Sequence, residues 1–276
     1  MKRNTQTITA KIISNKQIAP DHFLMKLSAP LIAKVSQPGQ FVTVKTQESG
    51  TNPLLRIPLG IHIRGADTIS VLYKTVGEGT KLISTKKKGE KVSVLGPLGN
   101  GFELELFLKQ KNNTAIIVAG GHGIAPLFFL AEEILKKKKK IEFFIGASTG
   151  NHILRAKELE KMGAKVYLAT EDGTQGHKGY VTDILESYIR RLAAIHHSLF
   201  TIYACGPRPM LSALAKIAKK ANIPARVSLD AYMACGVGAC LGCAVRAKEG
   251  YRLVCKDGPV FNAEEIEWDG SNCKNR

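Results

Sequence analysis

The pattern of hydrophobic and polar residues changes twice along the chain. From about residue 6 to residue 103, short runs either alternate apolar with polar residues or are rich in β-branched residues, and turn-forming residues separate them. Short strands at this spacing predict a small antiparallel β-barrel. We expect its strands at residues 8–13, 23–27, 40–44, 68–73 and 91–95.

The second pattern extends from about residue 112 to residue 229. Continuous apolar runs alternate here with segments of helical periodicity, which predicts a parallel sheet covered by helices. Ligands of such sheets bind beyond the carboxyl ends of the strands. We expect strands at residues 114–119, 141–145, 165–169, 199–204 and 225–229, and helices at residues 125–140, 154–162, 181–191 and 209–220.

The third part, residues 230–276, is short and contains most of the cysteines. A length of 276 residues suits two or three domains. The expected architecture is therefore a multi-domain chain with a β-barrel over residues 1–103, a nucleotide-binding type of α/β domain over residues 112–229, and a small cysteine-rich domain over residues 230–276.

Four cysteines in that last part have the spacing C-x4-C-x2-C-x11-C: Cys235, Cys240, Cys243 and Cys255. This is the plant-type arrangement of thiolates around a 2Fe–2S cluster, with the fourth ligand arriving from further along the chain. Gly236, Gly238 and Gly242 are expected to allow the tight turn around the cluster, because glycine accepts positive φ. The sequence thus predicts that the four cysteines ligate a metal cluster.

Zinc and plain buried cysteines are the alternatives to a cluster. Structural zinc sites usually pair two C-x2-4-C knuckles, and only one tight pair is present here. Disulfides are disfavoured because the sequence shows no secretory signal. Cys205 and Cys273 lie outside the pattern.

Glycine-rich loops mark the other candidate sites. Residues 77–80 can turn backbone amides and a hydroxyl toward a phosphate, and residues 96–102 form the expected exit from the barrel. Residues 119–126 and 205–207 each lead from a strand into a helix, where a pyrophosphate can approach a helix N-terminus. The loops at residues 77–80, 96–102 and 119–126 could each equally be an ordinary turn, and the loop at 119–126 does not carry a complete dinucleotide-binding fingerprint.

Composition narrows the class of protein. The net charge is +17, from 40 basic and 23 acidic residues, and lysine runs occur at 86–88 and 136–140. Without interleaved aromatic residues these runs favour a solvated face over nucleic-acid binding, and the charge could attract an acidic partner. No apolar run approaches the ~18 residues of a membrane span, and the polar N-terminus suggests a cytoplasmic protein.

The order of barrel, nucleotide fold and cluster resembles the ferredoxin–NADP reductase superfamily. More narrowly, the chain is similar to the electron-transfer subunits of B-type dihydroorotate dehydrogenase. The most specific stretches are residues 227–243 and 254–261, and residues 119–127, 170–174, 179–185 and 203–207 also match. The resemblance implies FAD on the barrel, a pyridine nucleotide (NAD) on the second domain, and a cluster that faces a partner subunit carrying FMN.

The resemblance also assigns cofactor contacts by position. The FAD contacts would be Ile57, Pro58, Leu59, Gly60, Leu72, Tyr73, Lys74, Gly79 and Thr80. The glycine-rich loops supply the NAD contacts, namely Gly120, Gly121, Gly123, Cys205, Gly206 and Pro207.

One FAD segment departs from the family. An Arg-Pro-Ile-Ser-like motif is expected where this chain has Ile57, Pro58, Leu59 and Gly60, so the arginine for the pyrophosphate and the serine near the reactive flavin nitrogen are both missing. Losing a charged contact to phosphate costs about 1.5–3 kcal/mol. Arg56 would replace Ile57 only through a bulge or a loop, because a one-residue shift on a strand reverses the side-chain face. Lys74 and a helix end could still hold the ligand.

The resemblance implies an oxidoreductase subunit of pyrimidine biosynthesis with no catalytic side chain of its own. Electrons from dihydroorotate oxidation on an FMN-containing catalytic subunit would pass through the 2Fe–2S cluster and FAD to NAD, within a heterotetramer. Apolar Tyr232, Met233 and Leu241 beside the ligands would face that partner. The alternatives are a reductase subunit of another assembly, of the ferredoxin–NADP transhydrogenase or sulfide dehydrogenase type, and a flavin-free electron-relay subunit.

Overall fold

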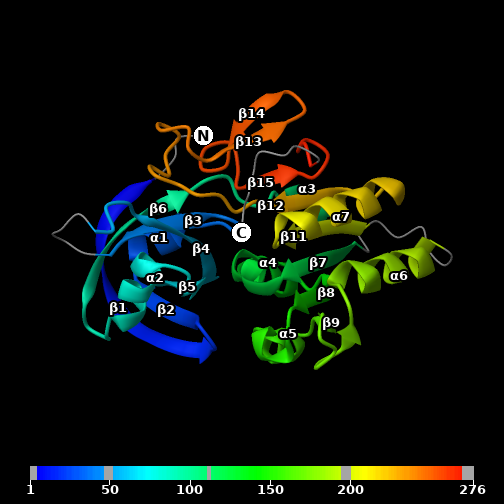
Figure 1. The fold of residues 1–276 in the computed structure, drawn as a ribbon, viewed down its shortest axis with the longest axis horizontal. Coiled ribbons are helices and arrows are strands. Elements are labelled where there is room, and N and C mark those ends of the chain that lie inside the picture. The colour runs from blue at the N-terminus through cyan, green and yellow to red at the C-terminus, as the bar shows by residue number, and fades with distance from the viewer. Residues whose placement is uncertain (1–4, 47–51, 111–112, 194–199, 269–276) are drawn as a thin grey trace.

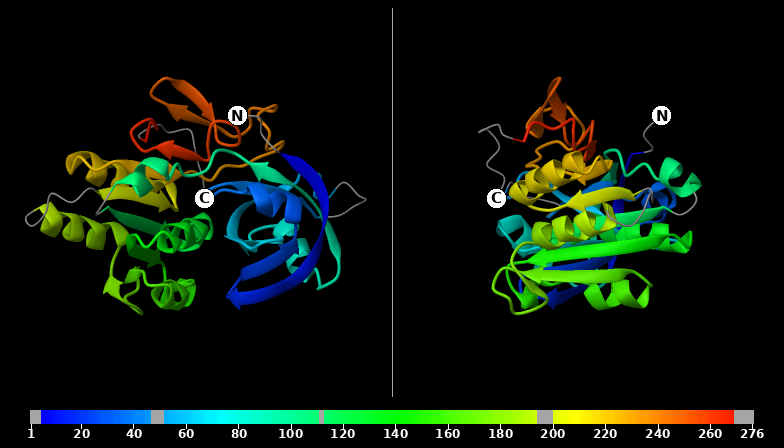
Figure 2. Two further views of the ribbon diagram at one scale, coloured as in Figure 1. Left: turned by 180° about the vertical axis from the view of Figure 1, so that it is seen from behind. Right: turned by 90° about the vertical axis from the view of Figure 1, so that its right-hand side faces the viewer.

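The chain forms three parts that pack around a common centre (Figure 1). The structure, a computed structural model, describes residues 5–46, 52–110, 113–193 and 200–268. Cys273 lies outside the described residues. The barrel and the α/β domain lie side by side, and the cysteine-rich part lies across one end of both, as the two further views also show (Figure 2).

The first part is the expected antiparallel barrel. Its six strands close in the order β1-β2-β5-β4-β3-β6. Apolar side chains fill its interior, including Val42, Val44, Ile61 and Val71. The strands are β1 (Gln6–Ala19), β2 (His22–Ser28), β3 (Phe41–Lys45), β4 (Ile57–Arg64), β5 (Thr68–Lys74) and β6 (Lys91–Leu98).

One barrel strand and three short helices differ from the expected elements. Strand β4 was not among the predicted strands, because Pro58 and Gly60 are rare inside strands; it pairs with β3 on one side and β5 on the other. The predicted phosphate loop at residues 77–80 is the first turn of α2 (Glu78–Thr85). The other two helices are α1 (Pro30–Val35) and α3 (Glu105–Lys109).

The second part is the expected parallel sheet with helices on both faces. The sheet order is β10-β9-β8-β7-β11-β12-β15. Its strands are β7 (Thr114–Gly120), β8 (Lys140–Ala147), β9 (Lys165–Thr170), β10 (His177–Lys178), β11 (Phe200–Cys205) and β12 (Ala225–Ser228). Its helices are α4 (Ile124–Lys136), α5 (Ala156–Lys161), α6 (Val181–Ala193) and α7 (Arg208–Lys220), with short 3₁₀ turns η1 (Gly121–Gly123) and η2 (Gly150–His152).

Helix α4 ends earlier than the sequence predicts. Its last residue is Lys136, Lys138 has a left-handed φ of 56°, and Lys140 already belongs to β8. The lysine run at residues 136–140 is therefore mostly a turn between a helix and a strand.

The third part is joined to the second through the sheet. It contains the hairpin of β13 (Ala244–Ala247) and β14 (Gly250–Leu253), and then β15 (Val260–Asn262), which pairs antiparallel with β12. Buried Cys243, Cys255 and Phe261 belong to the same apolar cluster as barrel residues Phe41 and Leu98. The cysteine-rich part thus packs against both other parts.

No helix in the described part of the chain is both long and apolar enough to cross a bilayer.

Candidate functional site

The cysteine loop begins with a sulfur that accepts several backbone hydrogen bonds. The Sγ atom of Cys235 accepts from the backbone N–H groups of Val237 (3.4 Å), Ala239 (3.3 Å) and Cys240 (3.4 Å). Burial raises the pKa of this thiol, but these donors and the Cys240 thiol together lower it to about 6. Such a sulfur suits the thiolate form that a metal requires.

The four sulfurs form two pairs. The Cys240 thiol donates to the Cys235 sulfur, and the Cys243 Sγ lies 3.2 Å from the Cys255 Sγ. Among the residues that the structure describes, no three such side chains gather closely enough to hold one ion. Two pairs suit the two irons of a binuclear cluster better than they suit one tetrahedral zinc ion.

Burial differs between the pairs. Cys243 and Cys255 are 3% and 1% exposed, whereas Cys240 lies at the surface. Burial, followed by the neighbouring Cys243 thiol, raises the pKa of Cys255 to about 12. One pair therefore faces the protein core and the other faces the outside.

The turn around the sulfurs uses different residues than expected. Gly236 and Gly238 have φ of 72° and 87°, as predicted, but Gly242 has no such conformation. Leu241 has φ of 61° instead, and this residue is 63% exposed. A non-glycine residue in the left-handed region is strained and is often found where a loop has a function.

The cysteine loop packs directly on the barrel. A Cβ built on Gly236 would lie 3.0 Å from Cγ2 of Thr43 in β3 and 3.4 Å from Cδ1 of Leu98. After the barrel, the Asn100 amide donates to the backbone oxygens of Lys256 (3.2 Å) and Asp257 (3.0 Å). These contacts fix the loop against the barrel surface.

The predicted FAD residues of β4 lie on two faces of that strand. Leu59 is buried in the barrel core, and Ile57 packs beside it. A Cβ built on Gly60 would lie 3.7 Å from Pro126 at the start of α4, so this position faces the α/β domain. Pro58 is paired with Thr43, which is the residue under the cysteine loop. Strand β4 therefore lies next to β3, the strand on which the cysteine loop packs.

Arg56 does not replace the missing arginine. Its guanidinium donates to the Ser93 Oγ (2.7 Å), the Ser93 carbonyl (3.2 Å) and the Thr43 carbonyl (3.4 Å). Ile57 instead lies against Gly79 in the first turn of α2, where a built Cβ would be 2.6 Å from its Cδ1. The rescue by Arg56 considered above is wrong for this structure, because the side chain is held by β3 and β6.

In β5 the predicted FAD residues also alternate. Leu72 packs in the apolar cluster shared with α4, and Lys74 ends the strand opposite His22 of β2. Tyr73 points into the barrel, where it is 2% exposed. Leu72 is also 2% exposed, so a ligand on the outer surface would meet the side chain of Lys74 and only the main chain of Tyr73.

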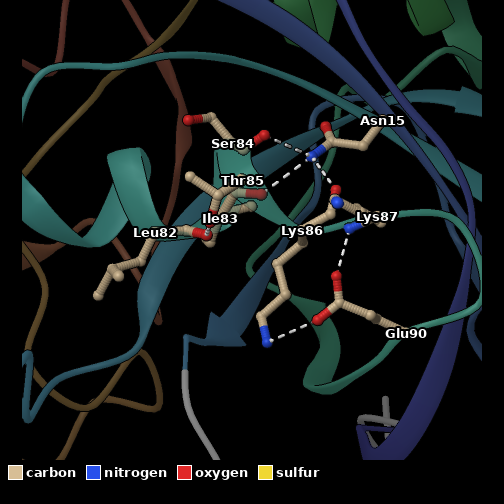
Figure 3. Close-up of polar contacts among 8 residues, drawn as sticks. All are labelled: Asn15, Leu82, Ile83, Ser84, Thr85, Lys86, Lys87 and Glu90. Carbon is tan, nitrogen blue, oxygen red and sulfur yellow. Dashed lines mark hydrogen bonds and ion pairs between the residues drawn. The ribbon is translucent and has the colours of Figure 1, made fainter.

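Tyr73 positions helix α2 through Asn15. The Tyr73 hydroxyl donates to the Asn15 Oδ1 (2.9 Å). Figure 3 shows how the Asn15 Nδ2 in turn donates to the carbonyls of Ile83 (2.9 Å) and Lys86 (3.0 Å) at the end of α2. At the other end, the Thr80 hydroxyl accepts from Val76 N–H (2.9 Å) and donates to the Gly77 carbonyl. Thr80 therefore caps the helix.

The predicted NAD loops lie in direct contact. A Cβ on Gly123 would be 2.2 Å from the Cys205 carbonyl oxygen, and one on Gly120 would be 2.7 Å from Pro207 Cδ. Gly121 has φ of 53° and faces open space. The β7–η1 and β11–α7 loops thus form one backbone-lined surface at the carboxyl ends of the strands. Burial raises the pKa of the Cys205 thiol to about 12, so its sulfur is a poor nucleophile or ligand.

Sequence reasoning missed a group of basic side chains between the two domains. The His22 and His152 ring centroids are 5.9 Å apart. Burial lowers the pKa of His22, and the charges of Lys74, His122 and His152 lower it further. These residues come from β2, β5, η1 and η2, so their proximity depends on how the domains dock. The spacing of the histidines along the sequence does not predict that they lie close together.

The residues present could hold three cofactors: an iron–sulfur cluster and two dinucleotides. Two cysteine pairs fit a 2Fe–2S cluster. The open backbone at Gly77, where a Cβ would meet nothing within 4 Å, leaves the first turn of α2 accessible to a diphosphate, with Lys74 as a nearby cation. The same open approach at Gly121 fits a second dinucleotide.

Comparison with known proteins agrees with this geometry. Residues 230–267 match a family described as the iron-sulfur cluster binding domain of dihydroorotate dehydrogenase B, and residues 117–216 match the oxidoreductase NAD-binding domain. The chain is 35% identical to "Dihydroorotate dehydrogenase B (NAD(+)), electron transfer subunit" of Desulforamulus reducens, over 96% of this chain and 100% of the relative. It is 40% identical to the protein of the same name from Geobacillus kaustophilus, over 92% and 96%.

Solved structures show the same fold. A structure of an NADH-dependent reduced ferredoxin-NADP oxidoreductase has a TM-score of 0.81 at 30% identity, with 96% of this chain and 91% of that chain covered. A ferredoxin NADP+ reductase from Neisseria gonorrhoeae, solved with bound FAD and NADP, has a TM-score of 0.63 at 16% identity, over 78% and 91%. The second likeness concerns the fold alone.

Proposed function

Because the chain belongs to the family of electron transfer subunits of dihydroorotate dehydrogenase B, we propose that it carries electrons between a partner dehydrogenase and NAD through a 2Fe–2S cluster and FAD. In the direction of pyrimidine synthesis the electrons come from the oxidation of dihydroorotate to orotate on an FMN-containing catalytic subunit. The proposed domains are residues 1–103 for FAD, 112–229 for NAD and 230–276 for the cluster.

One observation supports this proposal most: two pairs of cysteine sulfurs lie on a loop that packs on β3, next to the β4 strand of the FAD motif. Thr43 touches the loop at Gly236 and is paired with Pro58 in β4. An electron carrier needs its two redox groups close together in a fixed geometry, and this packing supports such an arrangement. Asn100 holds the segment after Cys255 in the same place.

The cofactors supply the redox chemistry: bound FAD exchanges a hydride with NAD, and the cluster exchanges single electrons with it. The protein supplies binding, orientation and exclusion of water. Cys235, Cys240, Cys243 and Cys255 hold the cluster; the first turn of α2 and Lys74 hold FAD; and the loops at residues 120–123 and 205–207 hold NAD. His22, His122 and His152 lie beside Lys74 at the place where the dinucleotides would meet.

The catalytic subunit binds the exposed side of the cysteine loop. Tyr232 and Leu241 are 71% and 63% exposed there, and Val237 is also exposed, whereas Met233 is only partly exposed and packs on the core. Exposed apolar residues beside a buried redox site indicate a protein interface. A heterotetramer of two chains of each kind is the proposed assembly.

Anaerobic co-expression with a candidate catalytic subunit tests the proposal. The purified complex should contain flavin, iron and acid-labile sulfide, and should reduce NAD when dihydroorotate is added, whereas the catalytic subunit alone should not. A loaded complex that fails to couple dihydroorotate to NAD would contradict the proposal.

A second candidate function rests on the likeness to the NADH-dependent ferredoxin-NADP oxidoreductase structure, at 30% identity over almost the whole chain. In that case the chain would be the reductase subunit of another assembly. Ferredoxin reduction by NADH or NADPH in a purified complex that does not oxidise dihydroorotate would favour this second function.

A further inference from the structure

A pocket opens at the β10 edge of the sheet in the α/β domain. Strand β10 is the last strand in the order of that sheet and pairs with β9 at Ala169 and Thr170. Beside this short pairing, the edge pocket has a volume of about 420 Å³, within the range of about 300–1,000 Å³ that is usual for small-molecule sites. Its lining includes Phe144, Tyr167, His177, Ile184, Ser187 and Arg191.

The edge pocket is separate from the cofactor sites proposed above. Phe144 of β8 and Leu185 of α6 belong to one apolar cluster, so the pocket lies on the face of the sheet that α6 covers. The loops at residues 120–123 and 205–207 follow β7 and β11, and β9 is two strands away from β7. Because neighbouring strands are about 4.8 Å apart, roughly 10 Å separates β9 from the nearer loop. The cysteine-rich part lies at the other end of the molecule (Figure 1).

Three aromatic rings lie together beside the edge pocket. The rings of Phe144 and Tyr167 are stacked, with centroids 4.6 Å apart and an angle of 10° between their planes. The ring of Tyr188 lies 5.3 Å from that of Phe144 and 5.6 Å from that of Tyr167. Aromatic rings favour stacked or edge-to-face contacts with further rings. This wall therefore suits a flat aromatic ligand.

The acidic group beside these rings already has a partner. The Tyr167 hydroxyl donates to the Glu142 Oε2 (2.6 Å). Burial raises the pKa of Tyr167 and of Tyr188, and Glu142 raises the pKa of both further, so both phenols stay neutral. In the described part of the chain, no acidic residue lines the edge pocket. The pocket thus presents no carboxylate to a ligand.

Positive charge surrounds the same rings. Arg191 of α6 lines the edge pocket, and its charge lowers the pKa of Tyr167 and of Tyr188 against the larger effect of burial. The Lys165 Nζ lies 5.2 Å from the centre of the Tyr167 ring. His177 adds an N–H donor to the lining. The charges at the edge pocket therefore favour an anion.

We propose that the edge pocket binds a planar aromatic anion, with the ring of the ligand on Phe144 and Tyr167 and its acidic group on Arg191. Arginine presents parallel N–H groups that match a carboxylate or a phosphate. The ring and the charge of the ligand are both required, because the pocket combines an aromatic wall with a cationic rim. This site is additional to the cofactor sites and does not depend on the proposed function.

Three small probes separate the two requirements. 1-Naphthoate has a flat ring and a carboxylate, 1-naphthamide keeps the ring without the charge, and acetate keeps the carboxylate without the ring. Isothermal titration calorimetry with the purified full chain measures each affinity. 1-Naphthoate should bind about fivefold more tightly than 1-naphthamide, as expected for an ion pair at a partly exposed site, and acetate should not bind measurably. Saturating NAD should leave the affinity for 1-naphthoate unchanged.

Substitutions in α6 locate the binding. Arg191→Gln should reduce the affinity for 1-naphthoate to that for 1-naphthamide and leave the amide unaffected. Arg190→Gln is the matched control: this neighbour is not part of the lining and bonds to Glu186 (2.6 Å), so its loss should change neither affinity. Ser187→Trp fills the pocket from an exposed position and should abolish binding of both ring compounds. Arg191 is also exposed, so Arg191→Gln decides the inference if Ser187→Trp does not fold.

Four results would overturn the inference. They are no binding of 1-naphthoate, equal affinity for 1-naphthoate and 1-naphthamide, an equal loss of affinity in Arg190→Gln, and displacement of 1-naphthoate by NAD. Equal affinities would make the pocket an apolar groove without a charge requirement, and displacement by NAD would make it part of the nucleotide site. These failures differ from failure of the proposed function, which would appear as a wild-type protein without iron and sulfide.

Discussion

The side chain of Ile57 lies against Gly79, so closely that a Cβ on Gly79 would be 2.6 Å from the Ile57 Cδ1. This contact joins β4 to the first turn of α2, where the diphosphate of FAD is proposed to bind. An apolar side chain stands where the family resemblance led us to expect an arginine, and Arg56 is held by Ser93 on the barrel. The main chain and Lys74 are left to bind the phosphates.

The first prediction follows from this contact. Ile57→Arg should tighten FAD binding to the flavin-stripped protein by about tenfold or more, because a charge-assisted hydrogen bond to phosphate contributes about 1.5–3 kcal/mol. Quenching of flavin fluorescence measures the dissociation constant. Ile57→Met, which has similar volume and no charge, is the control. Equal affinity of the Arg and Met variants would show that the diphosphate lies elsewhere.

His62 makes stability depend on pH. It is fully buried between β4 and α4, and its Nδ1 contacts the Ala125 carbonyl oxygen at 2.8 Å. Burial lowers the pKa of His62 to about 3, against 6.5 for the free side chain. The native state therefore binds fewer protons than the unfolded state between these values, so stability falls as the pH drops below 6.5.

The loss should be about 1.4 kcal/mol per pH unit below 6.5. His62→Gln keeps a donor for Ala125 but does not titrate, so its urea midpoint should change less than that of the wild type between pH 7.5 and 5.5. His177→Gln, at an exposed position in β10, is the control. Parallel pH curves for the wild type and His62→Gln would contradict the assignment.

The partner surface gives a third prediction. Leu241→Asp should weaken co-purification with the catalytic subunit by about tenfold or more, because a carboxylate would be buried without a partner. Leu106→Asp, at a position in α3 that is 73% exposed, should have no effect. Retention of the partner by Leu241→Asp would place the interface on another surface.

The sequence predicted the parts of the fold that depend on local patterning. Alternating apolar runs predicted the α/β order, and cysteine spacing predicted the sulfurs that the structure brings together. Strand β4 escaped prediction because Pro58 and Gly60 are poor strand formers, and tertiary pairing with β3 and β5 holds them in the sheet. Helix α2 escaped because its first turn is rich in glycine.

Other parts of the site depend on docking between distant segments. The side chain of Arg56 points toward Ser93, which is distant in sequence, so local patterning does not predict its direction. The proximity of His22 to His152 arises from the contact between the two domains. The left-handed turn fell at Leu241 rather than at Gly242. Glycine favours a positive φ, but the path of the whole loop determines which residue adopts it.

A fourth prediction separates cluster ligands from other buried cysteines. Cys255→Ser should lose the iron–sulfur absorption and the bound iron, because one pair of ligands is broken. Cys205→Ala should keep both, because Cys205 lies in the nucleotide loop and burial keeps its thiol protonated. Loss of the cluster from Cys205→Ala with retention in Cys255→Ser would reverse the assignment.

Anaerobic purification followed by analysis of metal and sulfide tests the central claim most directly. We expect iron and acid-labile sulfide in equal amounts, about two of each per chain, together with flavin. Stoichiometric zinc with no inorganic sulfide would contradict it.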